Sequence, residues 1–249
     1  MNCIVCVKRV PDSETRVRIA DDGRSIDPSG VKYVLNPYDE FALEAALELR
    51  EAAGGGAVTV LTLGGPDARE TLRTALAMGA DEAVLLEGEP PADGLVTARA
   101  LADEIGGRDP DLVLFGKQAI DDDNMQVPAM VAELLGFPCA TVVVDLEVDD
   151  GRLRASREVE GGHEPVECDL PAVVSAQKGL NEPRYASLKG IMAAKKKPLE
   201  TKPAEPAEPG LEVRSMREPP EREAGEILGE GPEAVPELVR RLHEEAKVL

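Results

Sequence analysis

The chain of 249 residues is poor in aromatic side chains, with three Phe, three Tyr and no Trp. Its core must therefore consist of Val, Leu, Ile and Ala, which suits a parallel sheet covered by helices on both faces. No apolar run approaches the roughly 20 residues of a membrane span, and the N-terminus shows no signal or transit segment. We therefore expect a soluble, cytoplasmic protein.

Basic residues are also scarce, because 28 Lys and Arg stand against 48 Asp and Glu and give a formal net charge of −20. This balance leaves no broad basic surface and argues against a general nucleic-acid binder. The four cysteines give no disulfide framework, since Cys3 and Cys6 lie three residues apart on an expected strand and so point to opposite faces. The two histidines are isolated. We expect no metal site and no catalytic residue.

Helical and strand-like patterns alternate through the first half of the chain. Gly and Pro punctuate them, and Asn36 before Pro37 is a favourable helix start. We expect strands over 2–7, 57–63, 83–86 and 112–115, and helices over about 37–53, 67–78, 93–105 and 126–135. Short connections between these elements predict a doubly wound, mainly parallel, Rossmann-like α/β sheet.

The period then changes to that of hairpins. Short apolar runs linked by turn residues over 141–148, 153–159, 165–170 and 172–176 predict strands that extend the sheet or form a small adjoining one. A further short hairpin is expected across 16–26, with its turn at Asp21–Gly23.

The composition shifts again after Pro198. Residues 199–249 hold seven of the twenty prolines and a net charge of −6, and only 237–248 show a helical apolar pattern. We expect a nucleotide-binding α/β domain over 1–198 and an extended arm over 199–249. An arm that becomes ordered on a partner and a flexible acidic tail both fit this composition.

Polar residues and glycines mark the ends of the expected strands, where ligands bind in open parallel sheets. The strand ends are Cys6–Arg9, Leu63–Pro66 and Gly116–Val127. The third runs into a helix start whose free amides suit a phosphate, and Asn36 is a fourth candidate contact. The P-loop pattern G-x-x-x-x-G-K-[ST] does not occur. Asp121–Asp123 fits either a Mg²⁺ site or a solvated turn with a helix cap, and we favour the turn.

The segment Asn181–Pro198 is basic within an acidic chain. Its cations are Arg184, Lys189, Lys195, Lys196 and Lys197, and its larger apolar side chains are Tyr185, Leu188, Ile191 and Met192. Apolar side chains ringed by lysines indicate a docking site for an acidic, partly apolar partner surface. The same pattern also fits an amphipathic helix over 187–197 that packs on its own domain.

Taken together, these segments resemble the β (small) subunit of electron transfer flavoprotein. The resemblance is carried by CVKRV (6–10), NPYDEFALEAAL (36–47), RTALAMGAD (73–81), GKQAIDDDNMQV (116–127), LPAVVSA (170–176) and NEPRYASLKGIMAAKKKP (181–198). It covers about the first 200 residues, and the arm matches only in character.

The resemblance implies an electron carrier rather than an enzyme, formed as a heterodimer with an FAD-carrying α subunit, with AMP bound structurally in this chain. Carried over by position, the AMP-binding residues would be Cys6, Asn36, Pro37, Tyr38, Asp39, Gly64, Gly116, Lys117, Gln118, Ala119, Ile120, Asp121, Asp122, Asp123, Asn124, Met125, Gln126 and Val127. The implied docking residues, in a recognition loop around Leu188, are Arg184, Tyr185, Leu188, Ile191, Met192, Lys195, Lys196 and Lys197.

The implied electron donors are acyl-CoA dehydrogenases of fatty acid β-oxidation and related flavin dehydrogenases. The implied acceptor is electron transfer flavoprotein–quinone oxidoreductase, which leads to the respiratory chain. Met125 and Val127 replace polar residues of some relatives, so these two would contribute only backbone.

Three different functions remain possible for such a sheet. Electron-bifurcating relatives hold a second FAD in place of AMP and tend to carry Asp-Gly-Asp-Thr, where Asp121–Asn124 stands here, which favours AMP. An adenine-nucleotide-processing enzyme would use the Asp121–Asp123 run, but the chain lacks a phosphate loop. A bare nucleotide sensor would need neither the basic segment nor the arm.

Overall fold

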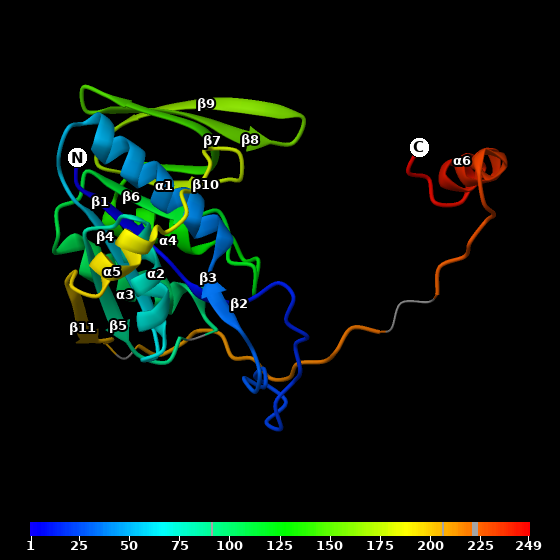
Figure 1. Cartoon of the computed structure of the whole chain (residues 1–249), viewed down its shortest axis with the longest axis horizontal. Coiled ribbons are helices and arrows are strands. Elements are labelled where there is room, and N and C mark those ends of the chain that lie inside the picture. Colours follow the sequence, from blue (N-terminus) through cyan, green and yellow to red (C-terminus); the bar gives the residue numbers. More distant parts are fainter. Residues whose placement is uncertain (91, 206, 221–223) are drawn as a thin grey trace. The chain divides into compact units, whose positions relative to one another are not determined.

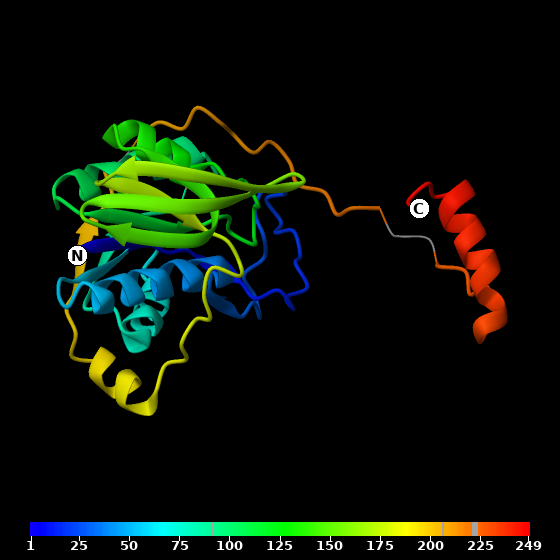
Figure 2. The same ribbon diagram turned by 90° about the horizontal axis from the view of Figure 1, so that it is seen from above.

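The computed structural model describes residues 1–90, 92–205, 207–220 and 224–249. The chain forms two compact units, Met1–Ser215 and Met216–Leu249. The first unit is built on a nine-stranded, mainly parallel sheet with helices on both faces (Figure 1 and Figure 2). The doubly wound α/β architecture predicted from the alternating pattern is therefore confirmed.

The strands of this sheet follow the order β11-β5-β4-β1-β6-β10-β7-β8-β9. Their bounds are β1 Cys3–Cys6, β4 Val58–Gly64, β5 Glu82–Glu87, β6 Leu112–Gly116, β7 Cys139–Asp149, β8 Arg152–Val159, β9 Gly162–Asp169, β10 Ala172–Ala176 and β11 Leu199–Pro203. Every residue of β1, β6 and β10 is buried. This is the pattern of central parallel strands that are covered on both faces.

The sheet separates two apolar clusters. Helices α1 Pro37–Ala52 and α2 Ala68–Met78 pack on one face, and α3 Gly94–Gly106 and α4 Val127–Leu135 pack on the other (Figure 2). Cys3 belongs to the first cluster and Cys6 to the second. The two thiols therefore point to opposite faces of β1, as the strand period predicted.

The strands after α4 extend the main sheet, but they are not all linked as hairpins. β7, β8 and β9 form an antiparallel meander, whereas β10 inserts between β6 and β7 and runs parallel to both. The β10 sequence AVVSA is almost wholly apolar, which is typical of a buried central strand. Its one polar side chain, Ser175, accepts a hydrogen bond from the Val142 amide at 2.9 Å where β7 bulges.

The hairpin expected across 16–26 is present in a short form, with an antiparallel bridge between Ile19 and Ile26 and backbone hydrogen bonds from the Ala20 amide to the Ser25 carbonyl and from the Asp27 amide to the Arg18 carbonyl. A longer ladder forms farther out, where β2 Arg9–Pro11 pairs with β3 Tyr33–Leu35. The Arg9 guanidinium lies 3.6 Å from the centroid of the Tyr33 ring, so this cross-strand pair adds a cation–π contact.

The first unit continues beyond residue 198, where the composition changes, because β11 pairs with β5 at the edge of the sheet. The second unit contains a 3₁₀ turn, Pro232–Ala234, and helix α6 Val235–Glu244, in which no residue is buried. None of the helices in the described parts of the chain is long and apolar enough to cross a membrane.

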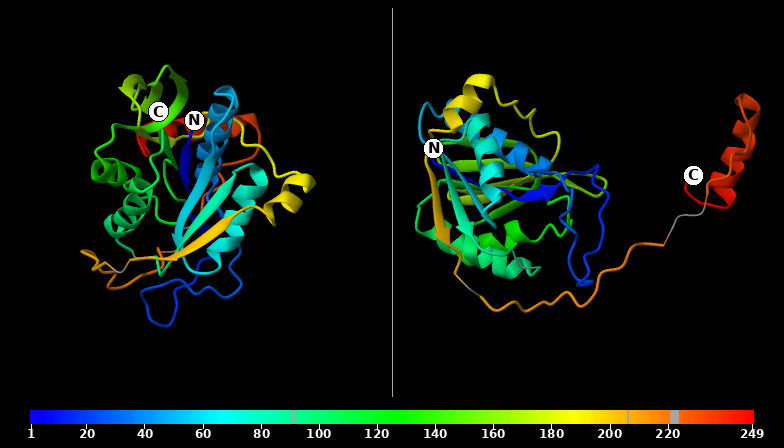
Figure 3. Two further views of the ribbon diagram at one scale, coloured as in Figure 1. Left: turned by 90° about the vertical axis from the view of Figure 1, so that its left-hand side faces the viewer. Right: turned by 60° about the horizontal axis from the view of Figure 1, so that its bottom comes forward.

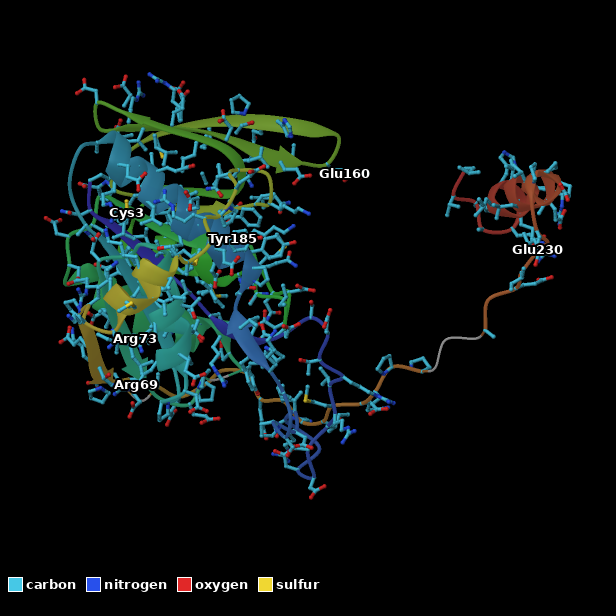
Figure 4. All side chains as sticks on the ribbon, viewed as in Figure 1. Cys3, Arg69, Arg73, Glu160, Tyr185 and Glu230 are labelled. Atoms are coloured by element: carbon cyan, nitrogen blue, oxygen red, sulfur yellow. The ribbon has the colours of Figure 1, made fainter. Side chains whose placement is uncertain are left out.

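The basic segment near residue 190 forms a short helix, α5 Leu188–Ala194, which packs on α2. Its inner side is built from small residues, since Ala194 is buried and a Cβ on Gly190 would collide with the carbonyl of Ala77. Arg73 of α2 donates to the carbonyl oxygens of Ala194 and Lys197 (Figure 4). The larger apolar side chains of α5 are therefore left on its outer side.

Arg184 fastens the chain before α5 to α1. Its guanidinium donates to the carboxylate of Glu44 at 2.8–3.0 Å and to that of Glu51 at 2.7 Å. Glu44 is only 4% exposed. Hydrogen bonds to Glu51 and Glu44 raise the pKa of Arg184 above its ordinary value. Arg184 thus anchors the segment to its own domain.

We expect Arg184→Met to lower the free energy of unfolding by about 3 kcal/mol, because it leaves the buried Glu44 carboxylate without its cation. Urea denaturation of the purified protein measures this. Lys189→Met, at an exposed position of the same segment, is the matched control and should change the value by no more than about 0.5 kcal/mol. Equal effects of the two substitutions would contradict an anchoring role.

Candidate functional site

A cavity of about 660 Å³ lies at the carboxyl ends of β1, β4 and β6. Its lining residues are Cys6, Val7, Lys8, Arg9, Asp39, Leu63, Pro90, Ala92, Gly94, Thr97, Leu101, Phe115, Lys117, Gln118, Ala119, Asp121, Asp122, Asn124, Met125, Gln126, Val127, Pro128, Leu211 and Val213. In doubly wound sheets, ligands bind at this edge. Segments 6–9 and 116–127, predicted at separate strand ends, meet here.

One buried carboxylate organises this edge. Asp39, in the first turn of α1, accepts hydrogen bonds from the Lys8 amide at 2.7 Å, the Gly116 amide at 3.1 Å and the Asn36 side chain at 2.9 Å. Burial raises the pKa of Asp39 to about 7, although all three donors favour the ionised form. The carboxylate therefore joins the tips of β1 and β6 to α1.

Asn36 acts from the same helix start, but it faces the protein. Its side-chain nitrogen donates to the Gln118 carbonyl at 2.9 Å, and its oxygen accepts from the Ile120 amide at 3.2 Å. The side chain is fully buried and does not line the cavity. Gly116 is required beside it, because a Cβ there would collide with Asp39 and with the backbone of Tyr38. Asn36 and Gly116 thus hold the cavity wall rather than face the cavity.

The segment before α4 presents backbone amides. Met125 has a φ of 56° and Gln126 follows with a φ of −101° and a ψ of −38°. Successive residues in left- and right-handed conformations make an anion-binding concavity, or nest. The amides of Met125, Gln126 and Val127 donate to no other described group, and all three residues line the cavity. The side chains of Met125 and Val127 are apolar, so this nest offers only backbone donors.

The charged groups of the cavity are partly paired. The Lys8 ammonium lies 2.8 Å from Asp121 and 3.0 Å from Asp122. Burial alone would lower the pKa of Lys8, but the bonds to these two carboxylates outweigh it and raise that pKa. A lysine thus occupies the acidic run that we considered for Mg²⁺. No set of three or more metal-binding side chains occurs among the residues that the structure describes.

The cavity also offers little for catalysis. Burial raises the pKa of the Cys6 thiol well above its ordinary value, so Cys6 is protonated. The Asp39 carboxyl group already accepts three hydrogen bonds from the protein. These groups suit the holding of a ligand rather than its conversion.

The structure brings most of the predicted nucleotide contacts together, but not all of them. Those that line the cavity are Cys6, Asp39, Lys117, Gln118, Ala119, Asp121, Asp122, Asn124, Met125, Gln126 and Val127. Those outside its lining are Asn36, Pro37, Tyr38, Gly64, Gly116, Ile120 and Asp123. Leu63 lines the cavity in place of its neighbour Gly64. Thr97 and Leu101 on α3, and Leu211 and Val213 after β11, were missed because nothing local in the sequence marks them.

A second surface of interest is the outer side of α5 together with Tyr185, three residues before this helix. The side chain of Tyr185, which is labelled in Figure 4, is 98% exposed. Leu188 is 76% exposed and Met192 is 65% exposed. Lys189, Lys195 and Lys196 are exposed beside them, and Ile191 is partly covered. We call Tyr185, Leu188, Lys189, Ile191, Met192, Lys195 and Lys196 the α5 surface.

Two predicted cations do not belong to the α5 surface. Arg184 is bound to α1, and the Lys197 ammonium donates to the carbonyl of Leu76 at 3.0 Å, near the end of α2. Burial lowers the pKa of Lys197. Both side chains therefore support the fold beneath α5.

Comparison with known proteins gives a consistent result. Residues 24–207 match the model of the electron transfer flavoprotein domain. The chain is 43% identical to electron transfer flavoprotein subunit beta of Bacillus subtilis, with all of both chains covered. It is 41% identical to the subunit of the same name from Syntrophomonas wolfei, covering 94% of this chain and 92% of that one. It is 39% identical to the subunit of the same name from Pongo abelii, covering 100% of this chain and 99% of that one.

We expect Asp39→Asn to destabilise the fold by about 1–3 kcal/mol. The side-chain amide of the new asparagine can keep its oxygen toward Asn36 and Gly116. Its NH₂ group then faces the Lys8 backbone amide, which is left buried and unpaired. Thermal or urea unfolding measures the loss. Asp103→Asn, on the exposed side of α3, is the control and should behave like the wild type. A wild-type stability for Asp39→Asn would show that the three bonds do not hold this edge.

Proposed function

This chain belongs to the electron transfer flavoprotein family as a β subunit, and we propose that it binds one AMP in the cavity described above. Membership makes it part of an electron carrier, a flavoprotein formed with an α subunit, rather than an enzyme in its own right. FAD is held mainly by the α subunit in this proposal, and the AMP is structural. The expected cytoplasmic location stays a prediction.

The single observation that carries the nucleotide proposal is the nest at Met125–Val127. Three backbone amides without a described partner stand at the start of α4, where the helix dipole also favours a negative charge. Apolar side chains such as Leu63, Leu101 and Phe115 line the same cavity and suit the faces of a base. A nucleotide with its phosphate on the nest and its base among these apolar side chains would contact both the polar and the apolar part of the cavity.

We further propose that the α5 surface docks flavin dehydrogenases of the acyl-CoA dehydrogenase type. The packing of α5 supports this, because its contact with α2 uses Gly190 and Ala194 and leaves Leu188 outside. The exposed lysines lie on a chain of net charge −20, so they form a local basic rim. An apolar anchor within a basic rim suits an acidic partner with an apolar pocket. Electrons would then pass through the α-subunit FAD toward a quinone oxidoreductase.

The second unit, Met216–Leu249, is proposed to pack on the α subunit. Val235, Leu238 and Val239 of α6 are each about half exposed, and no residue of that helix is buried. A helix that exposes one apolar side gains stability when a partner covers that side. The α subunit is the partner that family membership supplies.

The nucleotide proposal is tested on the heterodimer, co-expressed with the α subunit and denatured for mass spectrometry. We expect one AMP per heterodimer, and we expect Thr97→Phe to remove it, because the ring projects from α3 into the cavity. Thr74→Phe, at an exposed position of α2, should retain it. Two FAD per heterodimer and no AMP would favour the bifurcating class, and ATP hydrolysis would favour a nucleotide-processing enzyme.

Leu188→Ala tests the docking surface. We expect electron transfer from an acyl-CoA dehydrogenase to fall on the order of tenfold or more, as for a buried interface anchor. The melting temperature, FAD content and AMP content should not change, because Leu188 is mostly exposed. Leu134→Ala, at an exposed leucine of α4, is the control. Lower stability with normal electron transfer would make Leu188 a core residue and reject docking.

Deletion of residues 216–249 tests the proposed contact of the second unit with the α subunit. We expect heterodimer assembly, measured by analytical ultracentrifugation, to weaken by at least tenfold. The melting temperature of the isolated chain should stay within a few degrees, because the first unit is compact by itself. Wild-type assembly of the truncated chain would support the flexible-tail interpretation instead.

A further inference from the structure

The chain that follows β11 runs along the carboxyl edge of the sheet (Figure 3). Its path begins where the Ala204 amide donates to the Glu87 carbonyl at 3.0 Å, at the end of β5. Farther on, Glu212 pairs with Arg24 of the β2–β3 connection at 3.3 Å. The segment Gly210–Val213, which we call the strap and which contains Glu212, passes the start of α3.

The strap supplies part of the cavity lining. Leu211 and Val213 both line the cavity, together with Leu63, Leu101 and Phe115 from the sheet and α3. Leu211 is nevertheless 54% exposed, a large fraction for a leucine beside an apolar wall. A ligand between the strap and the sheet would cover apolar surface on both sides of the cavity.

Asp93 fixes the strap through one of its two carboxylate oxygens. Oδ1 accepts from the Leu95 amide at 2.9 Å and caps α3, whereas Oδ2 accepts from the Gly210 amide at 2.7 Å. The hydrogen bond from the Leu95 amide, and after it the hydrogen bond from the Gly210 amide, lower the pKa of Asp93. The same side chain thus performs two separable tasks.

We propose that the strap is a wall of the nucleotide site, in which Leu211 and Val213 contact the bound nucleotide and the Asp93–Gly210 bond slows its release. This inference rests on the proposed AMP function, and it adds contacts from a segment that lies outside the strand ends considered for the ligand. Because the strap is surface chain rather than core, its residues can be changed without unfolding the sheet.

Two variants separate the strap from the rest of the site. In Asp93→Asn, the amide oxygen can still cap α3, but the NH₂ group faces the Gly210 amide and the strap bond is lost. In the double variant Leu211→Ser with Val213→Ser, the bond remains and the apolar contacts are lost. Asp103→Asn and Met216→Ser are the matched controls, since Asp103 is exposed on α3 and Met216 lies just past the strap outside the cavity lining.

The experiment measures the exchange of bound AMP for isotopically labelled AMP in the purified heterodimer. We expect Asp93→Asn to speed AMP release severalfold, and the double variant to weaken AMP affinity on the order of tenfold. Unfolding midpoints and the controls should match the wild type.

Wild-type release and affinity in both variants, with AMP still present, would overturn the strap proposal and leave the AMP function standing. A wild-type heterodimer that contains and binds no AMP would overturn both. If the double variant loses AMP and its unfolding midpoint falls as well, the strap proposal would also be overturned. The strap would then be part of the core.

Discussion

The carboxylate of Asp39 is the point at which the sheet edge is joined. Its three acceptor bonds tie β1, β6 and the start of α1 into one rim, and Gly116 is the residue that lets the backbone come close enough. Asn36 extends this rim to residues 118–120. The start of the 116–127 segment, which leads to the nest before α4, is therefore held in place by a buried carboxyl group and a buried amide.

The packing of α5 on α2 positions the docking segment in a comparable way. Because Gly190 and Ala194 make the close contact, the helix gains its position through small side chains and keeps its large ones outside. Arg184 and Lys197 complete the attachment through Glu44 and the end of α2. A basic, apolar surface is thus held in place on an acidic protein, which suits a docking role.

Sequence patterns predicted the alternating elements well, since Gly, Pro and apolar periodicity act locally. They also located segments 6–9 and 116–127 at the cavity. They failed where the partner is distant in the chain. The insertion of β10 between β6 and β7, the edge strand β11, and the inward bonds of Arg184 and Lys197 all depend on tertiary neighbours. The strap residues Leu211 and Val213 were missed for the same reason, because only the fold brings them to the cavity.

Our central proposal is that the nest and the cavity rim hold a mononucleotide in the assembled protein. The most direct test is a crystal structure of the heterodimer purified with its own ligand. We predict density for a single AMP, with its phosphate within hydrogen-bond distance of the Met125, Gln126 and Val127 amides, and with Asp39 keeping its three donors. A phosphate bound elsewhere, or a flavin filling this cavity, would contradict the proposal.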